Sequence, residues 1–453
     1  MNNSGKIILL GFGISGESSA DYFVKKNIEI AIVDEKDESN FKSVLNKYKN
    51  NDKVSFYFGG KMPSININDI IIKSPGIPLD HLFITEAKKK GVKVVVDLEW
   101  AFNNTDAEII SITGTNGKTT ITTWISEILK LSGENSFAAG NIGVGVLEIL
   151  SKANKIDSLV LEMSSFQLSS IDKFRPNIAI YTNIEPDHIS WHGSFENYRD
   201  AKFNMSKNQT ENDYIIYNIE DNELSKWINS INVNKYAFSS KNKINKGMYI
   251  DKNGDIILID NGVYLPIINK NEINLIGIHN LENAMAVALA CYLKHVSLEV
   301  IADGLKKFKG VAHRTEKVAM KKGVLFVNDS KGTNPASTIK AIQAIDKKIH
   351  LILGGYDKKA SFDEVFSQFG DKVISLTILG ETKEQLIETA NRYKFENVFK
   401  VNTLDEAVEI SKRNAKSGEV VLFSPACASW DMYKNFEERG NHFKELVNKL
   451  RDW

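Results

Sequence analysis

A glycine-rich turn from Thr113 to Thr120, with the sequence TGTNGKTT, constrains this chain more than any other feature. The mostly apolar segment 108–112 before the turn predicts a short buried strand, and Ile121, Ile125 and Ile128 recur after it at helical spacing. A glycine-rich turn between a strand and a helix brings backbone N–H groups together beside the positive end of the helix dipole. The sequence therefore predicts a phosphate site at the start of this helix.

The residues inside the turn favour ATP as the ligand. Lys118 is placed to reach the outer phosphates, and Thr119 or Thr120 could ligate Mg²⁺. The turn is shorter than the common phosphate-binding loop, because Ile112 stands where that loop has its first glycine. An ordinary strand-to-helix turn is the alternative, but the Gly-Lys-Thr sequence favours a nucleotide. The predicted ATP contacts in the turn are Gly114, Thr115, Asn116, Gly117, Lys118, Thr119 and Thr120.

The length and charge balance of the chain restrict the class of protein. At 453 residues it exceeds what one core usually supports, so two or three domains are expected. Lysine plus arginine and aspartate plus glutamate each number 57, without long runs of one sign, which argues against nucleic-acid and membrane-surface partners. Only Cys291 and Cys427 occur, without metal-ligand spacing, and this favours a reducing compartment.

Apolar segments are too short or too interrupted for targeting or membrane insertion. Glycines break the only apolar run near the N-terminus, so no signal peptide is expected. The longest apolar stretch, 284–293, is far too short to span a bilayer. We expect a cytoplasmic protein that acts as a monomer, although the sequence does not fix the oligomeric state.

A first domain is expected to close near residue 96, with strands at 6–10, 29–33, 69–73 and 93–96. The first strand leads into a Gly-x-Gly-x-x-Gly loop at 11–16, and the second ends at Asp34. This fingerprint is typical of dinucleotide sites, but a nucleotide-sugar pyrophosphate would fit it equally well. The stiff turn at 74–78, with the sequence SPGIP, follows the third strand and is either a ligand contact or a plain loop.

Two strands of a central domain end in residues suited to a metal–phosphate site. The segment 158–162 ends at Glu162, and 178–182 leads to Asn183, Glu185, Asp187 and His188. A carboxylate such as Glu162 suits Mg²⁺. A lone histidine such as His188 more often donates or accepts a hydrogen bond.

Lys202 lies inside an apolar helical stripe formed by Phe195, Tyr198 and Met205. One interpretation is snorkelling, in which the stem is buried and the ammonium reaches water. The other is a lysine whose charge is lowered or chemically altered to serve the site. Position alone favours snorkelling.

The remaining sequence predicts an extension and a third domain. Turn signals at 252–255 and 260–263 flank a strand and predict hairpins in a structural extension. The residues His279, Asn280 and Asn283 begin a helix, where they either cap it or hold a nucleobase or ribose. Three later strands end in loops rich in Gly, Ser and charge, which predicts another α/β ligand edge beyond residue 310.

Several motifs occur in order along the chain: Thr113–Thr120, Glu162 with Ser164 and Ser165, Asn183–His188, His279 and Asn280 with Asn283, and His313 with Arg314. In this order they resemble the Mur ligases, which are ATP-dependent amino-acid ligases of peptidoglycan precursor synthesis. The segment 424–441 is similar to the branch that adds D-glutamate to UDP-N-acetylmuramoyl-L-alanine. The Asp-Asn-Pro-Arg signature of relatives that add diaminopimelate or lysine is absent.

The resemblance implies an α/β protein of three domains, each a mainly parallel, doubly wound sheet. A Rossmann-like domain at 1–96 would bind the UDP substrate, a P-loop ATPase-like domain at 97–310 would bind ATP, and a Rossmann-like domain at 311–453 would bind the amino acid. The implied cofactors are ATP and Mg²⁺, with two ions, and the implied small-molecule partners are UDP-N-acetylmuramoyl-L-alanine and D-glutamate.

The family roles carry over residue by residue. The implied catalytic residues are Lys118, Glu162, His188 and Lys202. The implied metal ligands are Thr119, Glu162, His188 and Lys202 in carbamylated form. The further ATP contacts are Asn280, Asn283, Arg314 and Asp329. The substrate contacts are Ser15, Gly16, Asp34, Ser74, Pro75, Gly76, Asn141, Lys331, Thr333, Ser429 and Phe436. Glu35 and Lys36 depart from the family's threonine and arginine, and either Lys358 or Lys359 could meet the glutamate side chain.

The expected chemistry is amide formation through an acyl phosphate, which converts a poor acyl donor into one with a phosphate leaving group. Catalysis would come mainly from positioning and charge neutralisation. Two alternatives stay open. One is a related ligase with another amino acid, such as a folate polyglutamate enzyme. The other is a nucleotide-sensing or NAD-binding regulator without ligase chemistry.

Overall fold

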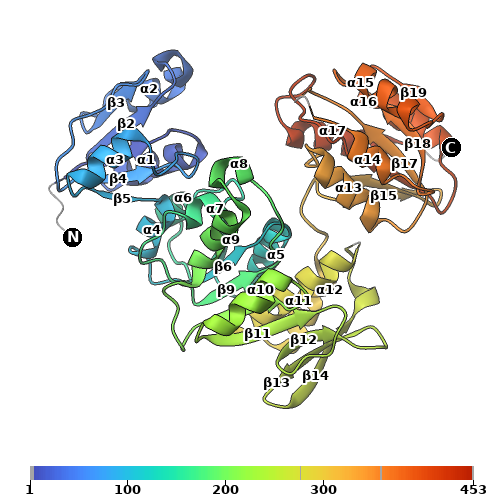
Figure 1. The fold of residues 1–453 in the computed structure, drawn as a ribbon, viewed down its shortest axis with the longest axis horizontal. Helices are drawn as coiled ribbons and strands as arrows, with labels where there is room; N and C mark the ends of the chain where they lie inside the picture. The colour runs from blue at the N-terminus through green and yellow to red at the C-terminus, as the bar shows by residue number, and fades with distance from the viewer. Residues whose placement is uncertain (1–4, 276, 358–359, 451–453) are drawn as a thin grey trace. The chain divides into compact units, whose positions relative to one another are not determined.

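The computed structural model describes residues 5–275, 277–357 and 360–450, and its strands form three sheets (Figure 1). The chain divides into two compact units. The first runs to Ile273 and includes Leu281–Lys306, and it contains the first two sheets. The second comprises Asn274–Asn280 and the chain from Lys307 onward, and it contains the third sheet. The predicted α/β class is confirmed.

The first sheet is parallel throughout, with the order β3-β2-β1-β4-β5. The strand order reverses beside β1, so the loops after β1 and β4 diverge and leave room for a ligand at their carboxyl ends. The strands are β1 (Ile7–Leu10), β2 (Ile30–Asp34), β3 (Val54–Phe58), β4 (Ile70–Lys73) and β5 (Lys93–Val95). The helices are α1 (Ile14–Lys25), α2 (Lys42–Tyr48) and α3 (Leu82–Lys89).

The second sheet has the order β14-β13-β12-β11-β10-β9-β6-β8-β7 and is parallel from β7 to β12. The hairpins predicted near 252–255 and 260–263 are confirmed, because β13 pairs antiparallel with both β12 and β14. The strands are β6 (Glu108–Thr113), β7 (Ser136–Gly140), β8 (Ser158–Glu162), β9 (Ile178–Tyr181), β10 (Tyr214–Asn218), β11 (Asn234–Ser239), β12 (Gly247–Ile250), β13 (Asp255–Asp260) and β14 (Val263–Asn269).

Helices accompany the second sheet along the chain, and the one that follows β6 begins at the end of the glycine-rich turn. They are α4 (Asp97–Phe102), α5 (Lys118–Leu131), α6 (Val146–Lys152), α7 (Ser165–Leu168), α8 (Ile189–His192), α9 (Phe195–Phe203), α10 (Asn222–Trp227), α11 (Ile278–Leu293) and α12 (Leu298–Lys307).

The third sheet has the order β15-β16-β20-β17-β18-β19, and only its edge strand β15 is antiparallel to its neighbour. The strands are β15 (Glu316–Lys321), β16 (Val324–Asn328), β17 (Ile349–Leu353), β18 (Val373–Ile378), β19 (Val398–Lys400) and β20 (Val420–Phe423). The helices are α13 (Pro335–Ala344), α14 (Asp363–Ser367), α15 (Lys383–Arg392), α16 (Leu404–Asn414) and α17 (Phe436–Lys449).

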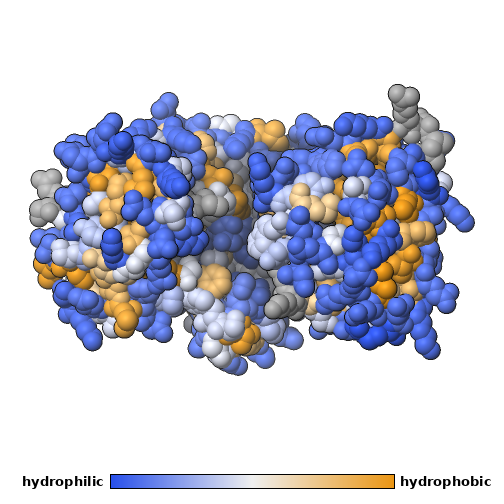
Figure 2. Space-filling view, turned by 90° about the horizontal axis from the view of Figure 1, so that it is seen from above, coloured by the Kyte–Doolittle hydropathy of each residue, from blue (hydrophilic) through white to orange (hydrophobic). Residues whose placement is uncertain are grey.

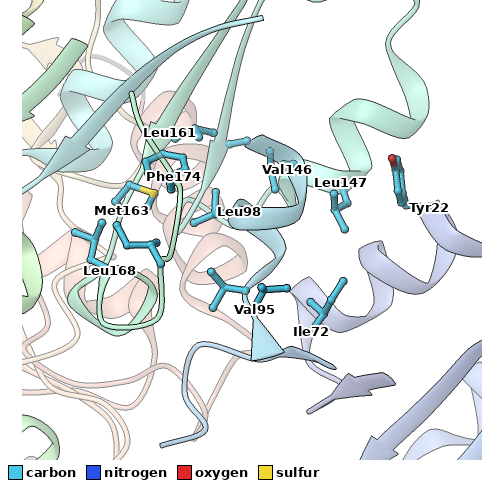
Figure 3. Close-up of a cluster of buried hydrophobic side chains, with 14 of the residues drawn as sticks. Tyr22, Ile72, Val95, Leu98, Val146, Leu147, Leu161, Met163, Leu168 and Phe174 are labelled. Atoms are coloured by element: carbon cyan, nitrogen blue, oxygen red, sulfur yellow. The ribbon is translucent and has the colours of Figure 1, made fainter. Parts of the chain in front are cut away.

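A single hydrophobic cluster joins the first two sheets within the first unit. Figure 3 shows Ile72 of β4 and Tyr22 of α1 near Leu147 of α6 and Leu98 of α4. The neighbouring Glu99 is fully buried, and its carboxylate accepts hydrogen bonds from three successive N–H groups, those of residues 172–174. Burial of a charge is tolerated here because backbone donors surround it.

Figure 2 shows one face on which hydrophilic residues predominate and hydrophobic residues occur in small groups. Among the described residues, none of the helices has the length and apolar character needed to cross a bilayer. Cys291 and Cys427 are both buried and unpaired thiols.

Candidate active site

The glycine-rich turn follows β6 and has a backbone that only glycine fits well. Gly114 and Gly117 adopt φ values of +142° and +88°. A Cβ atom at Gly114 would lie 1.9 Å from the Thr182 hydroxyl oxygen, and one at Gly117 would lie 2.6 Å from the Asn283 side-chain oxygen. Glycine therefore allows the turn to approach the loop after β9 and the helix α11 closely.

The loop after β9 holds the turn through several hydrogen bonds. The backbone N–H groups of Thr115 and Asn116 donate to the backbone and side-chain oxygens of Asn183, at 2.8 and 2.9 Å. The Thr182 hydroxyl donates to the Asn116 carbonyl at 2.6 Å. The Asn116 amide donates to the Glu185 carboxylate at 3.0 Å. These bonds bring the two predicted segments together and fix the shape of the phosphate site.

Lys118 begins α5 and folds back over the turn. Its Nζ donates to the carbonyls of Gly114 and Thr115, both at 3.0 Å. Of the two candidate magnesium-binding hydroxyls, Thr120 is buried and Thr119 is partly exposed. The turn thus places the Lys118 amine, backbone N–H groups and the Thr119 hydroxyl at the start of a helix. This combination is typical of a binding site for nucleotide phosphates.

Glu162 ends β8, which pairs with β6, and its two carboxylate oxygens differ in their contacts. The side chain is 3% exposed, and its Oε1 accepts a hydrogen bond from the Asn141 amide at 3.0 Å. Its Oε2 is buried and has no hydrogen-bond partner among the residues that the structure describes. A buried carboxylate oxygen without a partner is costly unless a ligand satisfies it. Asn141 and Glu162, predicted separately, therefore lie together.

The donor set fits Mg²⁺ bound together with phosphates. In the described part of the chain, no group of three or more His, Cys, Asp or Glu residues could hold a metal ion alone. Mg²⁺ does not need such a cage, because it commonly takes one or two protein ligands and completes its shell with water and phosphate oxygens. The orphaned Oε2 of Glu162 and the hydroxyl of Thr119 are suitable ligands of this kind.

Lys202 lies on α9 with its amine at the glycine-rich turn. The side chain is 2% exposed, its Nζ donates to the Gly114 carbonyl at 2.8 Å, and it lies 4.6 Å from the centre of the Tyr198 ring. Snorkelling, which position alone favoured, is wrong because the amine does not reach water. Burial lowers the pKa of Lys202 well below its ordinary value, and the charge of Lys118 lowers it further. A larger share of Lys202 amines is therefore uncharged than is usual for a lysine.

His188 immediately precedes α8 and is exposed. Its backbone is left-handed, with φ of +50°, which is uncommon for a residue other than glycine. Its Nε2 is 3.4 Å from the Asp187 carboxylate, and its ring lies 4.9 Å from that of Phe166 on α7. The strained backbone and exposed ring suit a group that meets a ligand.

His192 is a residue that the sequence analysis missed. Its Nε2 lies 2.9 Å from the Ser165 hydroxyl, and its ring stacks on Phe166 with an interplanar angle of 10°. Burial and the neighbouring His188 and Lys202 lower its pKa. The signal in the sequence was a second histidine four residues after His188, which puts both rings beside Phe166.

A separate cavity of about 360 Å³ opens at the carboxyl edge of the first sheet. Its lining includes Gly11–Gly13, Asp34, Ser74 and Gly76. Asp34 orders the glycine-rich loop, because its carboxylate accepts the Phe12 N–H at 2.7 Å. The predicted nucleotide-sugar residues on both sides of the sheet's switch point therefore lie together.

Three predicted contacts do not contribute to the described lining of this cavity, namely Ser15, Gly16 and Pro75. Ser15 accepts hydrogen bonds from Ser18 and Ser19 through its carbonyl. Gly16 allows α1 to approach the loop, because a Cβ there would lie 2.6 Å from the Gly11 carbonyl oxygen.

In the second unit, the predicted residue Asp329 is a buried carboxylate. It follows β16, and its carboxylate accepts the Ser424 hydroxyl at 2.6 Å and the Thr315 N–H at 3.0 Å. Burial raises its pKa to about 6. The strained residues His313 and Thr315, with φ of +64° and +42°, flank Arg314. Asn280 is also buried, at the start of α11.

The predicted amino-acid contacts gather near the start of α17. The Lys331 amine lies 5.6 Å from the centre of the Phe436 ring, and the Thr333 N–H donates to the Lys331 carbonyl at 2.9 Å. Ser429 is buried and follows β20 in the loop that begins at Ser424. Lys358 and Lys359 lie outside the described residues.

Arg439 holds these loops together and was not predicted as a site residue. It is 3% exposed and donates to the Ser330 carbonyl at 2.8 Å and to the Cys427 and Ala428 carbonyls at 3.0 Å each. Burial lowers its pKa to about 10. A charged residue one helical turn after Phe436, on the face toward the sheet, was the available signal.

Family models match three consecutive parts of the chain. The MurD-like N-terminal domain of Mur ligases matches residues 5–96, the Mur ligase middle domain matches 112–291, and the Mur ligase glutamate ligase domain matches 313–427.

Close relatives span the whole chain. A UDP-N-acetylmuramoylalanine–D-glutamate ligase of Clostridioides difficile is 40% identical over 98% of this chain and 99% of its own length. The ligase of the same name from Thermoanaerobacter is 41% identical over 98% of each chain. Solved structures share the fold at lower identity. UDP-N-acetylmuramate-alanine ligase MurC of Thermotoga maritima matches with a TM-score of 0.60 at 19% identity, over 98% of this chain and 99% of that one. The MurF ligase of the same organism, solved with ADP, matches with a TM-score of 0.59 at 17% identity, over 98% and 95%.

Proposed function

The chain belongs to the Mur ligase family, and from this premise we propose that it joins D-glutamate to UDP-N-acetylmuramoyl-L-alanine with conversion of ATP to ADP and phosphate. The observation that carries the proposal is the phosphate turn with buried Glu162 and Lys202 beside it, in a chain 40% identical along its length to a D-glutamate ligase. In this scheme residues 1–96 bind the uridine nucleotide, 97–310 bind ATP and 311–453 bind the amino acid. The product is a cytoplasmic precursor of peptidoglycan, made by a monomer.

The first step activates a carboxylate. An oxygen of the alanyl carboxylate attacks the γ-phosphorus of ATP, and the bond from that phosphorus to the bridging oxygen breaks, which gives an acyl phosphate and ADP. The N–H groups at the start of α5, beyond those of Thr115 and Asn116 that donate to Asn183, and the Lys118 amine would offset the charge on the transferred group. Mg²⁺, when bound, neutralises the phosphates and orders their oxygens, and Thr119 and Glu162 are the residues that would hold it.

The second step forms the amide. The D-glutamate amine attacks the acyl carbon, gives a tetrahedral intermediate, and expels phosphate as the carbonyl re-forms. The amine must lose a proton before or during attack, and His188 or a nearby carboxylate is suited to accept it. Lys331, Ser429 and Phe436 would orient the amino acid, and Arg439 would hold the loops that carry them.

Lys202 is proposed to act as a carbamate. Its uncharged amine attacks the carbon of CO₂, a C–N bond forms as one C–O π bond opens onto oxygen, and one amine proton leaves, so that a neutral amine becomes an anionic carbamate. Burial supports this step, because the charged ammonium is disfavoured at a position that is 2% exposed. The carbamate would add oxygen ligands for a second Mg²⁺ near the glycine-rich turn.

The test is phosphate release with ATP, Mg²⁺ and UDP-N-acetylmuramoyl-L-alanine over a panel of amino acids. We expect release with D-glutamate and none with L-glutamate. Release with another amino acid would keep the chemistry and reject the acceptor. Release with a folate substrate and glutamate would support the folate-type alternative. No release with any pair, despite nucleotide binding, would support the regulatory alternative.

A Lys118→Ala variant links this activity to the turn. We expect its turnover to fall by at least about 100-fold, because a charge that stabilises the transferring phosphoryl group is lost. The control is Lys130→Ala in the last turn of the same helix, which is exposed and should retain turnover. Equal activity in the two variants would reject the ATP-turn assignment.

A further inference from the structure

Lys73 is a fully buried lysine at the end of β4 whose role the proposed reaction does not explain. Its side chain is 1% exposed. Its Nζ donates to the carbonyls of Ser74 and Pro75, both at 3.3 Å, and of Ile77 at 2.9 Å. All three acceptors belong to the turn that follows the strand. The amine therefore uses its donors to hold the carbonyls of one turn.

Within the described part of the chain, the Lys73 amine donates hydrogen bonds to these three carbonyl oxygens and to no carboxylate. Burial lowers its pKa to about 8, the charge of Lys88 on α3 lowers it further, and the buried Asp97 opposes the shift. Asp97 is itself shifted by burial, which raises its pKa to about 6. At pH 7 Lys73 still carries its proton, so a charge is held in the interior by three carbonyl dipoles and by the field of the buried Asp97 carboxylate.

The turn that Lys73 holds forms one wall of the 360 Å³ cavity. Ser74, Gly76 and Ile77 line this cavity opposite the glycine-rich loop at Gly11–Gly13. The turn and loop are in close contact, since a Cβ at Gly11 would lie 2.7 Å from Ser74 and 2.9 Å from Ile77. A shift of the turn would therefore shift the loop.

The acidic groups at the cavity are already engaged. One Asp34 oxygen accepts the Phe12 N–H, and the other accepts the Lys36 N–H at 2.9 Å. Glu35 lies 3.3 Å from the His81 Nε2. Because the Phe83 N–H donates to the His81 Nδ1, the proton of a neutral His81 ring sits on Nε2 and faces Glu35. Behind the wall, Lys73 supplies a positive charge and the buried Asp97 a negative one, and it is Lys73 that is hydrogen-bonded to the turn.

We propose that Lys73 is a positioning residue of the nucleotide pocket, which holds the Ser74–Ile77 turn against the glycine-rich loop and favours an anionic ligand through the charge that it keeps behind this wall. The inference rests on the proposed function for the identity of the ligand, the diphosphate of a uridine nucleotide. A positive charge that is buried and fixed attracts phosphates more strongly than an exposed, solvated one. Since Lys73 does not line the cavity, it acts through the turn and through its field.

The test compares uridine, UMP and UDP, which share a base and differ in charge, on wild type and Lys73→Gln. Glutamine keeps a donor for the turn carbonyls and lacks the charge. We expect affinity for UDP to fall about 10-fold, affinity for UMP to fall less, and affinity for uridine to change less than about 2-fold. Ligand-observed NMR measures the dissociation constants of weakly bound ligands, and isothermal titration calorimetry measures those of tightly bound ligands.

Two controls separate charge from folding. Lys93→Gln removes an exposed lysine on the adjacent β5 and should change none of the affinities. Lys73→Met, which keeps most of the stem and removes every donor, should weaken uridine as well, because the turn loses its anchor. The melting temperature of each variant shows whether the first unit remains folded.

A pH series gives a second readout. The excess affinity of wild type for UDP over that of Lys73→Gln should fall as the pH rises through about 8, where Lys73 loses its charge. Lys88 and Asp97 are the other charged groups that face this amine, and Lys88→Gln should preserve the pH dependence.

The outcomes distinguish failure of this inference from failure of the proposed function. A loss that is equal for uridine and UDP would reject the charge effect. Wild-type affinity for UDP in Lys73→Gln would also reject the charge effect, and wild-type affinity for uridine in Lys73→Met would reject the positioning role. Failure of the wild-type protein to bind any uridine nucleotide would reject the proposed substrate and, with it, this inference.

Discussion

Substitution of Gly114 by alanine tests whether the turn geometry controls phosphoryl transfer. The backbone at Gly114 has φ of +142°, a region that costs other residues about 1–3 kcal/mol. The new Cβ would lie 1.9 Å from the Thr182 hydroxyl oxygen and 3.0 Å from the Asn183 carbonyl oxygen. Relief to an ordinary contact of about 3.4 Å requires a displacement of about 1.5 Å at Thr182.

That displacement disturbs two sides of the site. Thr182 holds the Asn116 carbonyl, and the Gly114 carbonyl accepts from both Lys118 and Lys202. A misplacement of about 1 Å can lower a rate about 100-fold, so kcat with ATP should fall by at least about 100-fold. Strain plus one lost hydrogen bond should lower the stability of the first unit by about 2–4 kcal/mol.

The matched control is Gly133→Ala, just after the same helix. Its φ of +96° imposes a similar backbone penalty, but no atom of the described residues lies within 4 Å of a new Cβ. We expect this variant to lose about 1–2 kcal/mol and to keep kcat within about 2-fold. The assays are steady-state phosphate release and urea unfolding followed by fluorescence. Equal kcat values in the two variants would refute the argument that turn geometry controls the reaction.

Three further predictions concern charge at the site. Glu162→Gln should raise the Mg²⁺ concentration needed for half-maximal phosphate release by at least about 10-fold, because a neutral amide replaces a carboxylate ligand. Lys202→Met should remove turnover, and the wild-type protein, but not the variant, should gain the mass of one CO₂ at this residue. Asp329→Asn should stabilise the second unit above pH 6 by up to about 3 kcal/mol, because burial raises the pKa of Asp329 to about 6.

Protonation of Asp329 favours the folded state, because the pKa of this residue is higher in the folded state than in the unfolded chain. The stability that protonated Asp329 contributes is therefore fully present below about pH 4. It is lost as the pH rises through about 6. The asparagine variant should lack this dependence. Unfolding curves that respond to pH identically in both proteins would contradict it. For the other two variants, unchanged Mg²⁺ dependence or retained turnover would contradict the roles of Glu162 and Lys202.

Local pattern was sufficient where one strand and one turn carried the information. The turn at Thr113–Thr120 and the strand ends at Glu162 and Asn183 were predictable because apolar runs mark buried parallel strands and polar residues follow them. The family model for the middle domain, which matches 112–291, agrees with this interpretation. The strand β3, with the sequence VSFYF, was not identified, although its β-branched and aromatic residues are typical of a strand.

The sequence pattern could not show which charged side chains are buried, because burial depends on three-dimensional packing. Lys202 has the same sequence signal whether its amine snorkels or is buried, and only the contact with the Gly114 carbonyl decides between these. Arg439 and Lys73 look like ordinary charges in the sequence. Each can be buried because carbonyl oxygens accept its hydrogen bonds, from the loop after β20 for Arg439 and from the turn after β4 for Lys73. These contacts form only in the tertiary fold.

The most direct test of the account is transfer of a heavy-oxygen label. UDP-N-acetylmuramoyl-L-alanine labelled in its alanyl carboxylate is converted with ATP, Mg²⁺ and D-glutamate, and the released phosphate is analysed by mass. The account predicts one labelled oxygen in each phosphate, because the carboxylate oxygen leaves with the phosphoryl group of the acyl phosphate. Unlabelled phosphate, formed together with the amide product, would contradict the acyl-phosphate mechanism.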